Sequence, residues 1–187
     1  MNAFELFFSL FGLILGLAVA RVIGGLSDVL GERKHIKIGL LTPMLAVFLL
    51  IELSSVWVNA WSGLTDIQVA YGPFVAATMV AAIYFFGAAM IFPKVPADWE
   101  TLDHYYMTHY RWVIGAVILA NIGLLLIEVG VTGNWALLRQ SLTSSPITLL
   151  WWAILASIWL IRRKWFQILG LVSLQLVWIY ILLVRWA

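Results

Sequence analysis

The chain has no cysteine, few charged residues, and no histidine or lysine in the middle of its long apolar segments. The absence of cysteine excludes disulfides, thiolate metal sites and cysteine nucleophiles. Charged residues make up 11% of the 187 positions, whereas soluble domains contain about 25%. No run of Lys and Arg is long enough to indicate nucleic-acid binding. The common phosphate-binding, zinc-protease and nucleophile motifs are also missing, so we predict no enzymatic activity and no cofactor.

Apolar residues, in contrast, fill most of the chain. They make up 64% of it, and the mean hydropathy is +1.01. A water-soluble fold of this size could not bury so much apolar surface. We therefore predict an all-helical integral membrane protein that contacts the lipid bilayer along most of its length.

Six segments are apolar and long enough to be candidate membrane spans, for which about 20 residues are needed. We predict one transmembrane domain over residues 1–187, with spans at about 4–26, 38–60, 71–93, 111–131, 146–161 and 165–185. The first segment resembles a signal peptide, but Glu5 and the lack of a basic start favour a retained span. The fifth is short, and an alternative is that 146–185 forms a hairpin that does not cross the membrane fully.

The basic residues are distributed unequally between the predicted loops. Nine of the eleven Lys and Arg lie in or beside the first, third and fifth connections, and two lie on the opposite side. Loops rich in Lys and Arg face the cytoplasm. We therefore predict that both termini lie outside the cell (N-out, C-out). We place the protein in the inner (plasma) membrane of a bacterium.

The longest predicted loop, 93–112, separates three spans from three. Pro93 and Pro96 end the third span, and a run of helix formers and aromatic residues follows Asp98. This pattern predicts a short interfacial helix on the cytoplasmic side. Because each half has an odd number of spans, any internal repeat would be inverted in the membrane.

Small residues recur at every fourth position of the first span. Such a ladder, a glycine zipper, lets two helix backbones approach closely in a bilayer. It predicts a helix-packing seam, either within the chain or between copies in a homo-oligomer, formed by Gly12, Gly16, Ala20 and Gly24.

Arg21 lies beside this ladder near the predicted cytoplasmic end. Its side chain is long enough to reach the interface, and Asp28 lies seven residues further along the same face. We interpret Arg21 as an interface anchor partly paired with Asp28, and the alternative is a charge at a cytoplasmic entrance.

Glu52 is the most informative residue because it lies inside the second span. A charged side chain at the bilayer centre costs about 2.5–3.5 kcal/mol on insertion scales, so such residues usually face a bundle interior or a water-filled cavity. Ser55 and Asn59 follow at three and seven residues, which places one polar stripe on this helix.

Two other spans carry polar residues at a similar depth. Asn121 lies ten residues beyond Arg111, and Gln175 ten beyond Trp165. Ten residues rise about 15 Å, half of a bilayer core of about 30 Å. Glu128 follows on the same face as Asn121, towards the outside.

These residues allow two interpretations. Glu52 could be a protonated group hydrogen-bonded to Asn121 or Gln175, which would join the helices. Alternatively, it could bind protons or small cations that enter past Asn59 and Glu128. We favour a proton or small-cation channel or transporter, and the alternative is an accessory or scaffold subunit of a larger membrane complex.

A metal site and a lipid-active enzyme are two weaker hypotheses for the 93–112 loop. Asp103, His104 and His109 could hold a metal, although their spacing matches no standard site. An enzyme at the interface would draw on Asp98, Glu100, Asp103 and His104. The surrounding tyrosines favour an interfacial aromatic belt instead, so we predict no metal site.

Overall fold

The computed structural model describes residues 3–34, 36–64, 71–136 and 146–186, and these residues are helical apart from short connections. The helices are α1 (Ala3–Gly31), α2 (Leu41–Leu64), α3 (Tyr71–Ala89), α4 (Leu102–Thr132), α6 (Pro146–Leu160) and α7 (Lys164–Trp186), with a 3₁₀ turn at Pro96–Asp98. The six predicted spans therefore all correspond to helices.

Five of these helices, α1, α2, α3, α4 and α7, are long and apolar enough to cross a membrane, which makes the chain a multi-pass membrane protein. The exception is α6, which has 15 residues. At 1.5 Å per residue it is about 22 Å long, less than the bilayer core of about 30 Å. The predicted fifth span is thus a helix too short to cross an unthinned bilayer upright.

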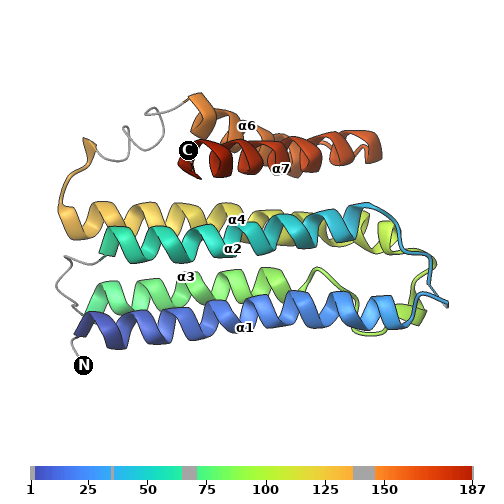
Figure 1. Cartoon of the computed structure of the whole chain (residues 1–187), viewed down its shortest axis with the longest axis horizontal. Coiled ribbons are helices and arrows are strands. Elements are labelled where there is room, and N and C mark those ends of the chain that lie inside the picture. Colours follow the sequence, from blue (N-terminus) through green and yellow to red (C-terminus); the bar gives the residue numbers. More distant parts are fainter. Residues whose placement is uncertain (1–2, 35, 65–70, 137–145, 187) are drawn as a thin grey trace.

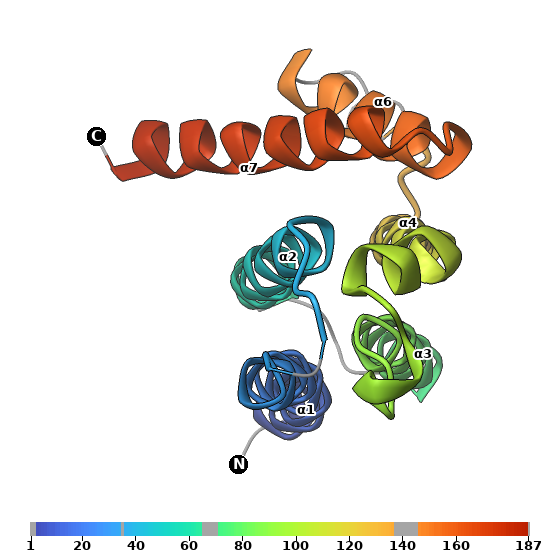
Figure 2. The same cartoon turned by 90° about the vertical axis from the view of Figure 1, so that its right-hand side faces the viewer.

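The first four helices form a bundle, and the last two form a hairpin against one side of it. Figure 2 looks along the axes of α1 to α4 and shows α7 lying across α2 and α4 at an angle to them. Contacts join α7 to α2 and α6 to α4, while α3 packs most extensively against α1 and α4. Figure 1 shows the α6–α7 hairpin on the α2–α4 side of the bundle, away from α1 and α3.

Small side chains determine how closely α3 and α4 approach. A Cβ atom added to Gly123 of α4 would lie 2.7 Å from a methyl group of Val80 in α3, so only glycine fits there. Close backbone approach of this kind holds helices together in a bilayer, where the hydrophobic effect does not.

The prediction of a separate interfacial helix before the fourth span was wrong. One continuous helix, α4, begins at Leu102, and Thr101 caps it by accepting a hydrogen bond from the backbone N–H of His104. No proline or glycine lies between Leu102 and Arg111 to interrupt the helix. The interfacial residues are therefore the first turns of the fourth span.

Gln167 stabilises the tight turn between α6 and α7. Its side chain is 0% exposed, and Nε2 donates to the carbonyl oxygens of Ile158 and Ile161 at 2.8 and 2.6 Å. Its Oε1 accepts a hydrogen bond of 2.7 Å from the hydroxyl of Tyr106 in α4. One side chain thus satisfies carbonyls at the α6 C-terminus and fixes the hairpin to the bundle.

Asp103 joins three helices at the same end of the molecule. Its Oδ1 accepts the backbone N–H of Leu41 at the start of α2, and its Oδ2 lies 2.8 Å from Nζ of Lys164 at the start of α7. A Cβ atom on Gly39 would collide with the Asp103 carboxylate. This end of the bundle is therefore held by a defined polar junction.

Candidate functional site

The candidate site is built around Glu52, whose side chain comes from α2 and is 2% exposed. Its Oε1 accepts hydrogen bonds from the hydroxyl of Tyr84 in α3 at 3.1 Å and from Nδ2 of Asn121 in α4 at 2.8 Å. Nδ2 of Asn121 also lies 2.8 Å from the Tyr84 hydroxyl and 3.0 Å from the Val117 carbonyl oxygen. Three helices of the bundle therefore meet at one carboxylate oxygen.

The second oxygen of Glu52 has a different environment. Oε2 is buried and has no hydrogen-bond partner. A buried carboxylate without a cation or further donors is costly, because charge is poorly solvated in an apolar interior. One oxygen of this carboxyl group is thus held by two donors, and the other is buried without a hydrogen-bond partner.

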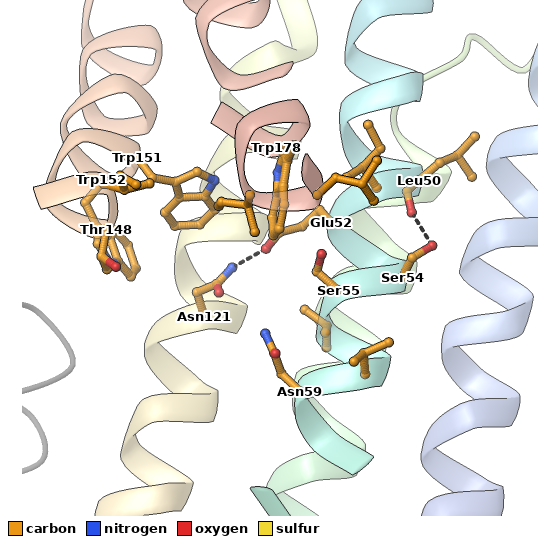
Figure 3. Close-up of a pocket in the computed structure, with 16 residues that line it drawn as sticks. Leu50, Glu52, Ser54, Ser55, Asn59, Asn121, Thr148, Trp151, Trp152 and Trp178 are labelled. Carbon is orange, nitrogen blue, oxygen red and sulfur yellow. Dashed lines mark hydrogen bonds between the residues drawn. The ribbon is translucent and has the colours of Figure 1, made fainter. Parts of the chain in front are cut away.

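Glu52 lies at the wall of a cavity of about 760 Å³ between the bundle and the α6–α7 hairpin. Figure 3 shows Ser55 and Asn59 on the same side of α2 as Glu52, with Asn121 facing them from α4. The described lining includes no Lys, Arg or His. Glu52 is therefore the ionisable group of the described lining.

Tryptophans form the hairpin side of the cavity. Trp151 and Trp152 of α6 and Trp178 of α7 line it (Figure 3), and the rings of Trp151 and Trp152 meet edge to face at 5.2 Å. The indole nitrogens of Trp151 and Trp178 are buried without hydrogen-bond partners. Since these N–H groups are sealed off, the two residues present ring carbon atoms to the cavity.

An apolar layer separates the cavity from the end of the bundle that carries Asp103. Along α2, α4 and α7 the layer consists of Leu45, Leu49, Val117 and Leu171, each 2% exposed or less. These side chains lie between Glu52 and the first turns of the three helices. The four positions named on this side of Glu52 are thus buried and apolar.

The predicted pathway residues divide into three groups. Asn121 bonds to Glu52, as the structural interpretation of Glu52 predicts, and Ser55 and Asn59 line the same cavity. Gln175 is elsewhere: its Nε2 donates to the Met44 carbonyl oxygen at 3.1 Å and ties α7 to α2. Glu128 is exposed on α4 and is not one of the residues that line the cavity.

Tyr84 belongs to the site but was missed from the sequence, because a tyrosine in an apolar span is normally attributed to packing. A usable signal exists. Tyr84 lies ten residues before Lys94, which places it at about the same depth in the membrane as Asn121. Counting residues from the basic end of the third span would have placed it at the level of Glu52.

The small-residue ladder of α1 contacts the rest of the chain at one end only. A Cβ atom on Gly12 would lie 3.2 Å from the Trp57 ring, whereas nothing lies within 4 Å of one on Gly16 or Gly24. Ala20 is exposed. The packing face of α1 is instead the row of buried residues Phe11, Leu15, Ala18, Val22 and Val29. A seam through Gly16 and Gly24 therefore stays a prediction about contact with another chain.

The charged residues near the ladder have separate environments. Arg21 is half-buried and Asp28 is exposed. Among the described residues, Asp103 forms an ion pair with Lys164, whereas Arg21 and Asp28 do not pair with each other. The pairing of Arg21 with Asp28 is thus not part of the structure.

The described residues contain no group of three or more His, Cys, Asp or Glu that could hold a metal ion. His109 stacks on Tyr105 at 4.2 Å, and Trp99 packs edge-on against both His104 and His109. Asp103 is engaged with Leu41 and Lys164. These side chains have structural partners, as expected of an aromatic belt.

Comparison of the chain with protein-family models, curated proteins and solved structures gives no match. Function must therefore be inferred from the chemistry of the site.

Proposed function

We propose that the protein transports protons or other small cations across the membrane, with Glu52 as the group that binds them. The observation that carries this proposal is the buried carboxyl group at the cavity wall, with one oxygen fixed by Tyr84 and Asn121 and the other without a partner. A helix-packing contact does not require a carboxyl group here, because an amide would accept the same hydrogen bonds.

The burial of Glu52, which is 2% exposed, favours a transporter over an open pore. The buried apolar residues Leu45, Leu49, Val117 and Leu171 lie along the helices between Glu52 and the Asp103 end. Transport then requires a change that exposes Glu52 to the other side, such as movement of the α6–α7 hairpin relative to the bundle. Ser55 and Asn59 would line the entry route to Glu52.

Orientation follows from the basic loops. With nine of the eleven Lys and Arg in or beside three connections on one side, we place those connections in the cytoplasm and both termini outside. The cavity would then open outward in the structure described. Arg21 and Asp28 would lie near the cytoplasmic surface of a bacterial plasma membrane.

A second candidate is a non-catalytic subunit of a larger membrane complex. The observation that favours it is the open surface over Gly16 and Gly24, which offers a second helix a close approach. The two functions differ in a mass measurement on protein gently extracted from its native membrane. A stoichiometric foreign partner supports the subunit, and a single species supports the transporter.

The test of the transporter is proton and cation flux into proteoliposomes that contain the purified protein. We expect Glu52→Gln to abolish flux while the protein remains folded, because the amide keeps an acceptor but binds no proton. Glu128→Gln is the matched control, since it removes a carboxylate that is exposed and outside the cavity. Equal flux for wild type and Glu52→Gln rejects the proposal.

A further inference from the structure

The cavity is much larger than its proposed cargo. A volume of about 760 Å³ lies in the range of about 300–1,000 Å³ that is typical of sites for small organic molecules. A proton needs no such space. A bare divalent ion such as Ca²⁺ needs about six to eight oxygen ligands, and no acidic cluster of the described residues supplies them.

The walls of the cavity match one class of ligand. Trp151, Trp152 and Trp178 contribute aromatic surface, and the two neighbouring rings of α6 stand at 87° to each other, which forms an aromatic corner. Cations are attracted to the faces of aromatic rings, and tryptophan binds them best. Glu52 adds a carboxyl group, and the described lining holds no basic side chain that would repel a cation.

Alternative ligands fit these walls less well. An anion would face Glu52 without any basic partner in the described lining. A neutral ligand would bond to hydroxyl groups such as those of Ser55 and Thr148, but it would provide no counter-charge for Glu52. Apolar side chains such as Ile147, Ile181 and Leu182 complete the wall, which suits a cation with an apolar body.

We propose that this cavity binds a monovalent organic cation with an apolar body, a quaternary ammonium or a similar onium ion, between the tryptophans and Glu52. The assignment rests on the proposed function of Glu52 as a cation-binding group and names its substrate class. Binding of one such cation replaces one proton: the O–H bond of the neutral acid breaks, the proton leaves to water, and the carboxylate pairs with the cation. No oxidant or further reactant is needed.

The test uses a pair of ions with the same shape and opposite charge, tetraphenylphosphonium and tetraphenylborate. Binding of each is measured to the full-length protein in nanodiscs by equilibrium dialysis, with uptake by empty nanodiscs subtracted. We expect saturable binding of the phosphonium and none of the borate. In weakly buffered solution, about one proton per bound phosphonium should be released.

Two variants identify the groups that bind. Glu52→Gln should weaken phosphonium binding at least about tenfold and abolish proton release. Trp152→Leu, which leaves the hydrogen bonds of Glu52 intact, should weaken binding about tenfold. The control for the second variant is Trp112→Leu, because Trp112 is exposed on α4 and is not among the lining residues. If a variant does not fold, the comparison of the two ions on the wild-type protein still decides the test.

The outcomes separate this inference from the proposed function. If the borate binds as well as the phosphonium, or if neither Glu52→Gln nor Trp152→Leu changes phosphonium binding, the cavity is only an apolar void and the inference fails. If proton flux depends on Glu52 but no saturable phosphonium binding occurs, the inference fails while the proposed function stands. If flux and binding are both absent, both are rejected.

Discussion

The Nδ2 atom of Asn121 lies 2.8 Å from Oε1 of Glu52, although 69 residues separate them in the sequence. This contact joins α2 to α4 at the level where Tyr84 of α3 reaches the same oxygen. Because Asn121 and Tyr84 occupy one oxygen, the other remains without a partner. The bundle therefore holds one oxygen of its buried acid and leaves the other without a hydrogen-bond partner.

Tyr84→Phe tests whether this contact stabilises the bundle. The substitution removes the hydroxyl that donates to Glu52 and keeps the ring. We expect a loss of unfolding free energy of about 1 kcal/mol, since hydrogen bonds between membrane helices average less than that and rarely exceed about 2. The measurement is a titration with SDS of the protein in mild detergent, following helix content.

Tyr180→Phe provides the control, because Tyr180 is 53% exposed on α7. Its hydroxyl is not part of the Glu52 cluster, so its loss should leave the free energy of unfolding unchanged. Equal losses for the two variants would show that the Tyr84 hydroxyl contributes nothing specific.

Glu52→Gln and Glu52→Leu separate the structural role of the residue from its charge. Glutamine keeps an oxygen that accepts from Tyr84 and Asn121, so the unfolding free energy should stay within about 1 kcal/mol of wild type. Leucine leaves those donors facing an apolar side chain, and we expect a loss of about 1–3 kcal/mol. The same SDS titration measures both. A leucine variant as stable as the glutamine variant would contradict the hydrogen-bonded cluster as a stabilising element.

Much of this arrangement could be predicted from composition and depth. The apolar segments marked all six helices, and counting residues from basic ends placed Asn121 at the level of Glu52, which is confirmed by their hydrogen bond. The same counting failed for Gln175, because depth says nothing about direction around a helix. Gln175 bonds to the Met44 carbonyl instead.

Other features depend on tertiary packing that periodicity does not encode. The oblique hairpin of α6 and α7 is fixed by Gln167, which is buried between α6 carbonyl oxygens and Tyr106. In the sequence, Gln167 looks like an interfacial polar residue next to the basic turn at Arg163 and Lys164. The cavity tryptophans, likewise, are recognisable only once the hairpin is placed against α2 and α4.

Gly39→Ala tests the junction at Asp103. An added methyl group would overlap the Asp103 carboxylate, which binds the Leu41 backbone and Lys164. We expect a loss of about 1–3 kcal/mol, the usual cost of an overpacked site. Gly31→Ala is the matched control, because nothing lies within 4 Å of a Cβ atom there. If SDS titration gives the same free energy of unfolding for Gly39→Ala and wild type, the junction accommodates the added methyl group and the prediction is wrong.

Gly16→Leu and Gly24→Leu test whether the ladder of α1 contacts another copy of the chain. No atom of the described chain lies within 4 Å of a Cβ atom at either position, so the fold of one chain should tolerate both substitutions. If a second copy packs against these glycines, leucine prevents the close backbone approach. We therefore expect unchanged helix content and unfolding free energy, but a shift from oligomer to single chain in mass analysis of the gently extracted protein.

Gly123→Leu distinguishes this effect from general damage to the bundle. A Cβ atom at Gly123 meets Val80 within the same chain, so this variant should lose stability whatever its oligomeric state. Should Gly16→Leu and Gly24→Leu leave the mass of the extracted protein unchanged, the ladder faces lipid and contributes no contact between copies. Should they instead release a foreign protein, α1 is the docking helix of a larger complex, and the accessory-subunit function gains the support that the transporter loses.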